Sequence, residues 1–152
     1  RALRWIEVAQ AADGTLVIAG EAGTILRSGD AGAPWSKATT PYEGSYFGVQ
    51  PLAGSQVVVY GMRGKLMRSD DGGASFSEVT HPVMTSLFGS ALAADGRLLV
   101  VGQNGELLSS HDGAQTFTRF KIEGSPMLSS VLAVEGGADA FGEKGLHAAK
   151  TN

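Results

Sequence analysis

Three aspartates, Asp30, Asp71 and Asp112, are the side chains in this sequence whose spacing most strongly suggests chemistry, because consecutive members lie 41 positions apart. Carboxylates can act as general acids and bases or ligate a cation. Hydrolysis by a carboxylate pair needs two such groups within about 10 Å of each other. We expect instead that each aspartate lies on its own copy of a repeat, far from the others, where it accepts hydrogen bonds from the N–H groups of a turn.

Each aspartate belongs to a motif with a serine two positions before it and an aromatic residue five positions after it. The three copies are Ser28, Asp30 and Trp35; Ser69, Asp71 and Phe76; and Ser110, Asp112 and Phe117. A fixed period of 20 to 50 residues indicates a repeat architecture. We therefore expect these nine residues to be structural, with the Trp or Phe packed into its repeat.

A second motif, Gly-x-x-Gly, has the same period. Its copies begin at Gly20, Gly61, Gly102 and Gly142, at spacings of 41, 41 and 40. Between the motifs, near-continuous apolar runs such as 57–60 and 98–101 predict strands that are buried on both faces. Four short strands in each period of about 40–45 residues are typical of a β-propeller blade. We expect Gly-x-x-Gly to join the second and third strands, and the aspartate motif to join the third and fourth.

The 152 residues are thus predicted to be all-β, as one partial β-propeller domain over residues 1–152. About 3.75 four-stranded antiparallel blades are expected, at residues 4–40, 45–81 and 86–122, with an incomplete blade at 127–150. Because propellers typically have 4 to 8 blades, we expect this chain either to be the C-terminal half of a longer propeller or to close a ring as a homodimer.

Composition excludes several classes of function. The net charge is −3 without a block of like charges, so no nucleic-acid partner is expected. There are no cysteines, and no apolar run approaches the ~20 residues that span a bilayer. His81, His111 and His147 lack the spacing of metal ligands, and no nucleotide-binding motif occurs. We predict no metal, no cofactor and no membrane insertion.

The serine–aspartate–aromatic motif resembles the Asp-box of BNR-repeat proteins, Ser-x-Asp-x-Gly-x-Thr-Trp. The second copy fits well, with Ser75 and Phe76 at the last two positions, whereas the first has Pro34 at the Thr position and the third has Ala114 at the Gly position. Together with the segments 23–28 and 64–69, these residues make the chain similar to the propellers of photosystem II stability and assembly factors.

This resemblance implies a parent propeller of about seven blades in a periplasmic or other extracytoplasmic setting. It also implies a non-catalytic function, as an assembly factor or accessory subunit that binds a protein partner within a larger envelope or membrane-associated complex. The alternative is a sialidase-like glycoside hydrolase or a carbohydrate-binding propeller. By resemblance, a sialidase needs an arginine cluster and a tyrosine paired with glutamate. Arg27 and Arg68 are repeat features, and no such pair can be read from the spacing.

The candidate partner-binding residues are those that differ between repeats on the Gly-x-x-Gly turns and the loops between blades. Both groups should emerge on one face of a propeller, and aromatic, Met and Arg side chains are favoured at protein interfaces. The predicted set is Tyr42, Glu43, Met62, Arg63, His81, Met84, Gln103, Asn104 and Lys144. No catalytic residue is predicted.

Overall fold

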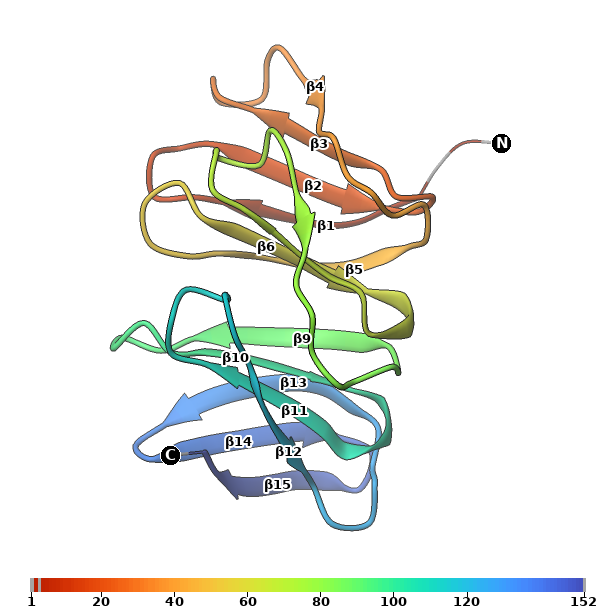
Figure 1. The fold of residues 1–152 in the computed structure, drawn as a ribbon, viewed down its shortest axis with the longest axis vertical. Helices are drawn as coiled ribbons and strands as arrows, with labels where there is room; N and C mark the ends of the chain where they lie inside the picture. Colours follow the sequence, from red (N-terminus) through yellow and green to blue (C-terminus); the bar gives the residue numbers. More distant parts are fainter. Residues whose placement is uncertain (1, 3, 152) are drawn as a thin grey trace.

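The computed structural model describes residue 2 and residues 4–151, and these fold into four antiparallel sheets stacked along the long axis of the molecule (Figure 1). The first three sheets have four strands each and the last has three, and within every sheet the strands are neighbours in chain order. The prediction of an all-β propeller fragment with an incomplete last blade is confirmed. We number the sheets as blades 1 to 4.

The strand bounds follow the predicted period. Blade 1 contains β1 (Trp5–Gln10), β2 (Leu16–Gly20), β3 (Ile25–Ser28) and β4 (Ser36–Lys37). Blade 2 contains β5 (Tyr46–Pro51), β6 (Val57–Gly61), β7 (Leu66–Ser69) and β8 (Ser77–Glu78). Blade 3 contains β9 (Leu87–Leu92), β10 (Leu98–Gly102), β11 (Glu106–Ser110) and β12 (Thr118–Lys121). Blade 4 contains β13 (Leu128–Val134), β14 (Gly137–Gly142) and β15 (Gly145–Lys150).

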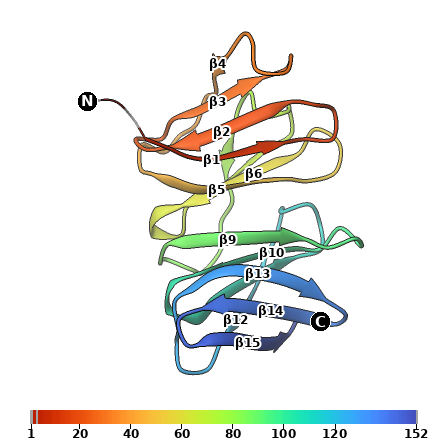
Figure 2. The same cartoon turned by 180° about the vertical axis from the view of Figure 1, so that it is seen from behind.

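The first strands of the blades, β1, β5, β9 and β13, succeed one another along one side of the stack (Figure 2). The short fourth strands lie on the opposite side (Figure 1). Phe47 of β5 and Phe88 of β9, which are 41 residues apart, bring their ring centroids to 5.5 Å. The side of the first strands is therefore where neighbouring blades approach each other, as around the axis of a propeller.

Apolar clusters fill the spaces between consecutive blades. Between blades 1 and 2, Val17 and Ile25 pack with Tyr46, Met67 and Phe76. Every residue of β6 and of β10 is buried, as the apolar runs predict. In β2 only alternate positions are fully buried at the start of the strand, because one face of blade 1 has no neighbouring blade in the described part of the chain.

The predicted packing of the Asp-box aromatic residues is correct for two copies and wrong for the first. Phe76 is buried and Phe117 is partly buried against the cluster between blades 2 and 3. Trp35 is 38% exposed. The aromatic side chain of each blade packs toward the blade before it, and no blade precedes blade 1 among the described residues, so Trp35 lies on an open face.

Hydrogen bonds within the Asp-box turns explain why serine and aspartate recur. In blade 2, Ser69 Oγ accepts from Gly73 N at 2.9 Å and donates to Asp71 Oδ1 at 2.7 Å, and Asp71 Oδ1 also accepts from Ser75 N at 2.9 Å. In blade 3, Ser110 Oγ donates to Asp112 Oδ1 at 2.9 Å, and that oxygen accepts from Thr116 N at 2.9 Å. The carboxylate thus satisfies turn N–H groups.

In blade 1 the serine keeps this role and the aspartate does not. Ser28 Oγ accepts from Gly32 N at 3.0 Å. Pro34 occupies the position of Ser75 and has neither a backbone N–H nor a hydroxyl to donate to Asp30.

Two arginines link consecutive blades in a way that the sequence does not reveal. Arg27 Nε donates to Gly72 O in the turn of blade 2 at 3.0 Å, and Arg68 Nε donates to Gly113 O in the turn of blade 3 at 2.6 Å. The next residue in this series is Ser109, because it lies 41 positions after Arg68. Its buried hydroxyl has no hydrogen-bond partner among the described residues.

The Gly-x-x-Gly turns join the second and third strands as predicted, but their two glycines have different roles. At Gly61 the backbone is extended, and a Cβ atom would collide with the carbonyl oxygen of Ser45. At Gly64 the φ angle is +73°, which favours glycine. The turns of blades 2 and 3 contain the 3-10 helices η1 (Met62–Gly64) and η2 (Gln103–Gly105). The fourth turn is shorter, because Gly142 pairs directly with Gly145 in a two-residue hairpin.

Candidate functional site

The Gly-x-x-Gly turns and the loops between blades lie at one end of the strands, on the right-hand side of Figure 1, where backbone hydrogen bonds join them. We call this surface the loop face. Between blades 1 and 2, Gly23 N donates to Gly44 O at 2.7 Å and Met62 N donates to Ser45 O at 3.0 Å, so one loop is bonded to the turns on both sides of it. Between blades 3 and 4, Gly105 N donates to Pro126 O at 2.6 Å and Glu143 N donates to Met127 O at 2.8 Å. The loop face is therefore a continuous, hydrogen-bonded band.

Tyr42 is half-buried in this band. Its hydroxyl donates to Met62 O at 3.3 Å, and its ring meets the ring of Tyr46 edge-on at a centroid separation of 5.7 Å. Lys65 Nζ lies 5.8 Å from the centre of the Tyr42 ring, within reach of a cation–π attraction. Tyr42 therefore braces the loop between blades 1 and 2 and leaves only part of its ring for a partner.

His81 has a similar role in the loop between blades 2 and 3. Its Nε2 lies 2.6 Å from Gly64 O, and its Nδ1 accepts from Val83 N at 3.2 Å. This pair of bonds assigns the proton to Nε2 of a neutral ring. Burial lowers the pKa of His81, against the effect of the Gly64 carbonyl. His81 is thus a support for the loop face more than a free contact residue.

The other seven predicted residues are exposed on the loop face: Glu43, Met62, Arg63, Met84, Gln103, Asn104 and Lys144. Arg63, Asn104 and Lys144 occupy turn tips with φ angles of 58°, 60° and 66°. Met84 is 77% exposed. Structure brings Tyr42 together with the turn of Met62 and Arg63, and His81 with the same turn, whereas Lys144 lies apart on the hairpin of blade 4.

A cavity of about 420 Å³ lies at the blade 1 end of the loop face. Tyr42 and Glu43 line it on one side, and Ala22 and Gly23 of the first turn line it on another. Residues 37–40 complete the wall. This cavity can accommodate a side chain of a partner, and it is the concave part of the predicted surface.

The Asp-box aspartates lie at the opposite end of the strands, one to a blade. Burial alone would raise the pKa of Asp71, but hydrogen bonds from the hydroxyls of Ser75 and Ser69 and from nearby N–H groups lower it to about 2. Hydrogen bonds from the hydroxyl and N–H of Thr116 lower the pKa of Asp112 to about 2. Both carboxyl groups are ionised and occupied by the turn, as a structural role requires.

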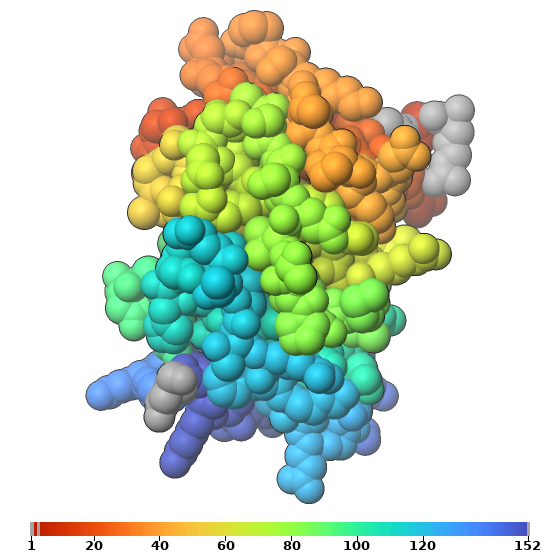
Figure 3. Space-filling view, in the orientation of Figure 1, coloured from red at the N-terminus to blue at the C-terminus, as the bar shows by residue number. Residues whose placement is uncertain are grey.

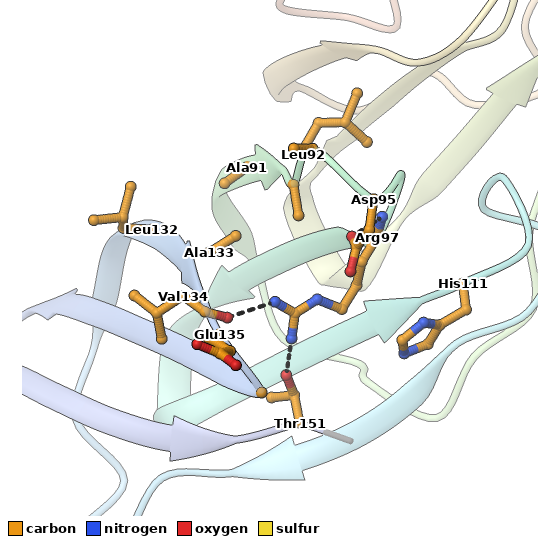
Figure 4. Close-up of a pocket in the computed structure, with 13 residues that line it drawn as sticks. Ala91, Leu92, Asp95, Arg97, His111, Leu132, Ala133, Val134, Glu135 and Thr151 are labelled. Carbon is orange, nitrogen blue, oxygen red and sulfur yellow. Dashed lines mark hydrogen bonds between the residues drawn. The ribbon is translucent and has the colours of Figure 1, made fainter.

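The sequence did not predict one site at the Asp-box end of the strands. Figure 4 shows Arg97 against a cavity of about 600 Å³ between blades 3 and 4. Arg97 is 5% exposed, and its guanidinium donates to Thr151 Oγ1 at 2.6 Å and to Val134 O at 2.8 Å. No ion pair joins it to a carboxylate in the described part of the chain. The only sequence signal was that the equivalent positions, Gln56 and Thr15, are not arginine.

Within residues 2 and 4–151, no group of three or more acidic, histidine or cysteine side chains is placed to hold a metal ion. The same described residues include no helix long and apolar enough to cross a membrane.

No protein-family model and no curated protein sequence matches this chain. Solved structures do match it. An ancestral GH74 enzyme superposes with a TM-score of 0.78 at 14% identity, over 95% of this chain and 22% of that one. The chain has a β-propeller fold. YCF48 from Cyanidioschyzon merolae superposes with a TM-score of 0.69 at 18% identity, over 99% of this chain and 52% of that one. YCF48 bound to D1 peptide superposes with a TM-score of 0.68 at 16% identity, over 93% of this chain and 48% of that one. The propeller chain therefore spans about half the length of YCF48 and less than a quarter of the GH74 enzyme.

Proposed function

We propose that this chain is a non-catalytic, protein-binding propeller of the Asp-box class that resembles the photosystem II assembly factors. It acts as an assembly factor or accessory subunit of a larger envelope or membrane-associated complex. The protein partner docks on the loop face. An extracytoplasmic location, such as the periplasm, is part of this proposal.

The observation that carries the proposal is the construction of the loop face. Its backbone is fixed by hydrogen bonds between turns and loops, and its exposed side chains include Met62, Arg63 and Met84. A rigid surface loses little conformational entropy when it binds, and Met and Arg are enriched at interfaces. That a protein of the same fold, YCF48, has been solved bound to D1 peptide supports a protein ligand.

The chemistry of the candidate acids and tyrosines also supports a binding function. An aspartate with a pKa of about 2, such as Asp71 or Asp112, cannot donate a proton at neutral pH. Burial raises the pKa of Tyr46 to about 12 and raises that of Tyr60 further, so neither forms a phenolate readily. These groups are poorly suited to acid–base or nucleophilic catalysis.

The alternative is a glycoside hydrolase or carbohydrate-binding propeller, and the likeness to the ancestral GH74 enzyme favours it among the enzyme classes. It requires sugar-binding or acid–base groups that converge in a cleft. Binding to a glycan array, followed by hydrolysis of any glycan that binds, would support this alternative and count against the assembly factor.

The proposal also requires that another part of the functional molecule packs against each of the two open ends of the stack. Trp5, Val8 and Trp35 are 50%, 59% and 38% exposed on blade 1, and Leu132 and Leu146 are 57% and 58% exposed on blade 4. Apolar faces of this kind are interaction surfaces or aggregation hazards. In the functional molecule we infer that further blades of a longer chain, or a second copy, cover them.

Site-specific photo-crosslinking in cells tests the docking face. A crosslinking residue at position 84 or 104 should capture the same discrete polypeptide, whereas one at Glu135, exposed at the other end of the strands, should not. In the captured complex, Arg63→Ala should weaken binding and Glu135→Ala should not. If position 135 captures the same polypeptide as efficiently as position 84, the partner does not dock on the loop face and the proposal is wrong.

A further inference from the structure

Two reciprocal hydrogen bonds tie a Gly-x-x-Gly turn to the residue just before the first strand of its blade. In blade 3, Gln103 N donates to Ser86 O at 2.9 Å, and Ser86 N donates back to the side-chain oxygen Gln103 Oε1 at 3.0 Å. In blade 4, Glu143 N donates to Met127 O at 2.8 Å, and Met127 N donates back to Glu143 Oε2 at 3.3 Å. We call this pair of bonds the loop latch.

Blade 2 has only half of the loop latch. In blade 1 the latch is complete, because Glu21 N donates to Arg4 O at 3.1 Å and Arg4 N donates to Glu21 Oε2 at 3.3 Å. The equivalent turn residue of blade 2 is Met62, which lies 41 positions after Glu21. Met62 N donates to Ser45 O at 3.0 Å, but a thioether is a weak acceptor. Ser45 N has no acceptor among the described residues.

Oxidation of Met62 would supply the missing acceptor. Methionine sulfoxide carries its oxygen on Sδ, and glutamine carries Oε1 on Cδ, which is equally far along the side chain. The sulfoxide oxygen can therefore take the place from which Gln103 Oε1 accepts a bond from Ser86 N. Sulfoxide is polar, unlike the thioether. Because the other three blades already have Glu or Gln at this position, the fold can accommodate the oxidised side chain.

Met62 is accessible to an oxidant. It lies on the turn of blade 2, whose yellow segment projects on the right-hand side of Figure 3, and it is 37% exposed. The sequence has no cysteine, so the thioethers of its four methionines are its only sulfur groups. Met84 and Met127 are also exposed on the loop face, whereas Met67 is fully buried. Of these four side chains, only that of Met62 occupies the latch position.

We propose that Met62 is a site of reversible oxidation, and that its sulfoxide completes the loop latch of blade 2 by accepting a hydrogen bond from Ser45 N. The oxidant is a hydroperoxide. The Sδ lone pair attacks a peroxide oxygen, the S–O bond forms as the O–O bond breaks, and the peroxide is reduced to water or an alcohol. A dithiol reverses the step, becoming a disulfide while the oxygen leaves as water.

Oxidation would fix the loop between blades 1 and 2. This loop carries Tyr42, whose hydroxyl donates to Met62 O at 3.3 Å, and it lines the cavity at the blade 1 end of the loop face. A second bond to the same turn would make the wall of that cavity more rigid. The inference goes beyond the proposed function, because it concerns a modification of the chain and does not require a docked partner.

Hydrogen exchange of the Ser45 amide, followed by NMR, tests the proposal. In a protein with Met84→Leu and Met127→Leu, Met62 is the one exposed methionine. Hydrogen peroxide should add one oxygen atom to Met62 and none to Met67, which mass spectrometry can show. Exchange at Ser45 should then slow about fivefold, as expected for the net gain of one hydrogen bond. Without oxidant, Met62→Gln should slow exchange by a similar factor and Met62→Leu should not.

Oxidation of Met84 in a Met62→Leu protein is the matched control and should leave exchange at Ser45 unchanged. A thiol-dependent methionine sulfoxide reductase should restore the original exchange rate in the oxidised protein. The proposal is overturned if oxidation of Met62 leaves exchange at Ser45 unchanged or makes it faster, even where Met62→Gln slows it. It is also overturned if peroxide modifies Met84 and Met127 of the unaltered protein and spares Met62. None of these measurements involves a partner, so this proposal and the proposed function fail separately.

Discussion

Phe76 and Trp35 occupy equivalent positions of consecutive repeats, and we predict that truncating them to alanine has very different effects. Phe76 is 7% exposed in the cluster between blades 1 and 2, so Phe76→Ala should cost about 3–5 kcal/mol of unfolding free energy. Trp35 is 38% exposed on an open face, so Trp35→Ala should cost roughly 1–2 kcal/mol in the monomer. For a protein of this size, about 2–4 °C of melting temperature is lost per kcal/mol.

Urea unfolding followed by circular dichroism, at a dilute and at a concentrated protein sample, measures both effects. The exposed neighbours Ser36→Ala and Ser77→Ala are matched controls and should each change stability by less than about 0.5 kcal/mol. A loss in Trp35→Ala that grows with protein concentration would mean that a second copy covers blade 1. A loss equal to that of Phe76→Ala in dilute monomer would refute the reasoning, because the face of Trp35 would then be as well packed as the space between blades.

Three other variants test the inferred roles. The pKa of Asp112 is about 2 in the folded protein, against an ordinary value of 3.8. Asp112 therefore stabilises the fold above pH 4, and this contribution to the unfolding free energy is lost as the pH falls toward 2. Asp112→Asn should flatten this part of the curve of unfolding free energy against pH. Arg97→Met should free the end of β15, and hydrogen exchange should show protection lost in β14 and β15 with little change in blades 1 and 2. Asp139, on the open face of blade 4 where earlier blades have Val17, Val58 and Leu99, should oppose any ring closed by a second copy, so Asp139→Val should strengthen self-association in sedimentation experiments.

The period of 41 residues was sufficient to predict the strands, both kinds of turn and the incomplete last blade, because these depend on local sequence patterns that recur in each repeat. Properties that depend on a neighbouring blade could not be predicted from the sequence. Trp35 matches Phe76 in sequence, yet it is exposed because the blade that would cover it is absent from the described chain. The loop face was predicted as a surface, but the sequence did not reveal that His81 supports it, since its partner is the carbonyl of Gly64, 17 residues earlier on the turn of blade 2.

Departures from the repeat are more informative about function than the repeat itself, because they mark the positions at which one blade differs from its predecessors. Ser109 of blade 3 replaces the arginine that links each earlier blade to the next one. Asp139 of blade 4 replaces the valine or leucine that each earlier blade packs against the next one. The two ends of the stack therefore need different partners. Blade 1 presents large apolar side chains, at the positions that blade 2 buries, and is suited to receive a whole sheet. Blade 4 has a partly polar face, because Asp139 stands where the earlier blades have valine or leucine. A ring of two identical copies would place Asp139 against the apolar side chains of blade 1, so we expect this contact to be weaker than the packing between consecutive blades.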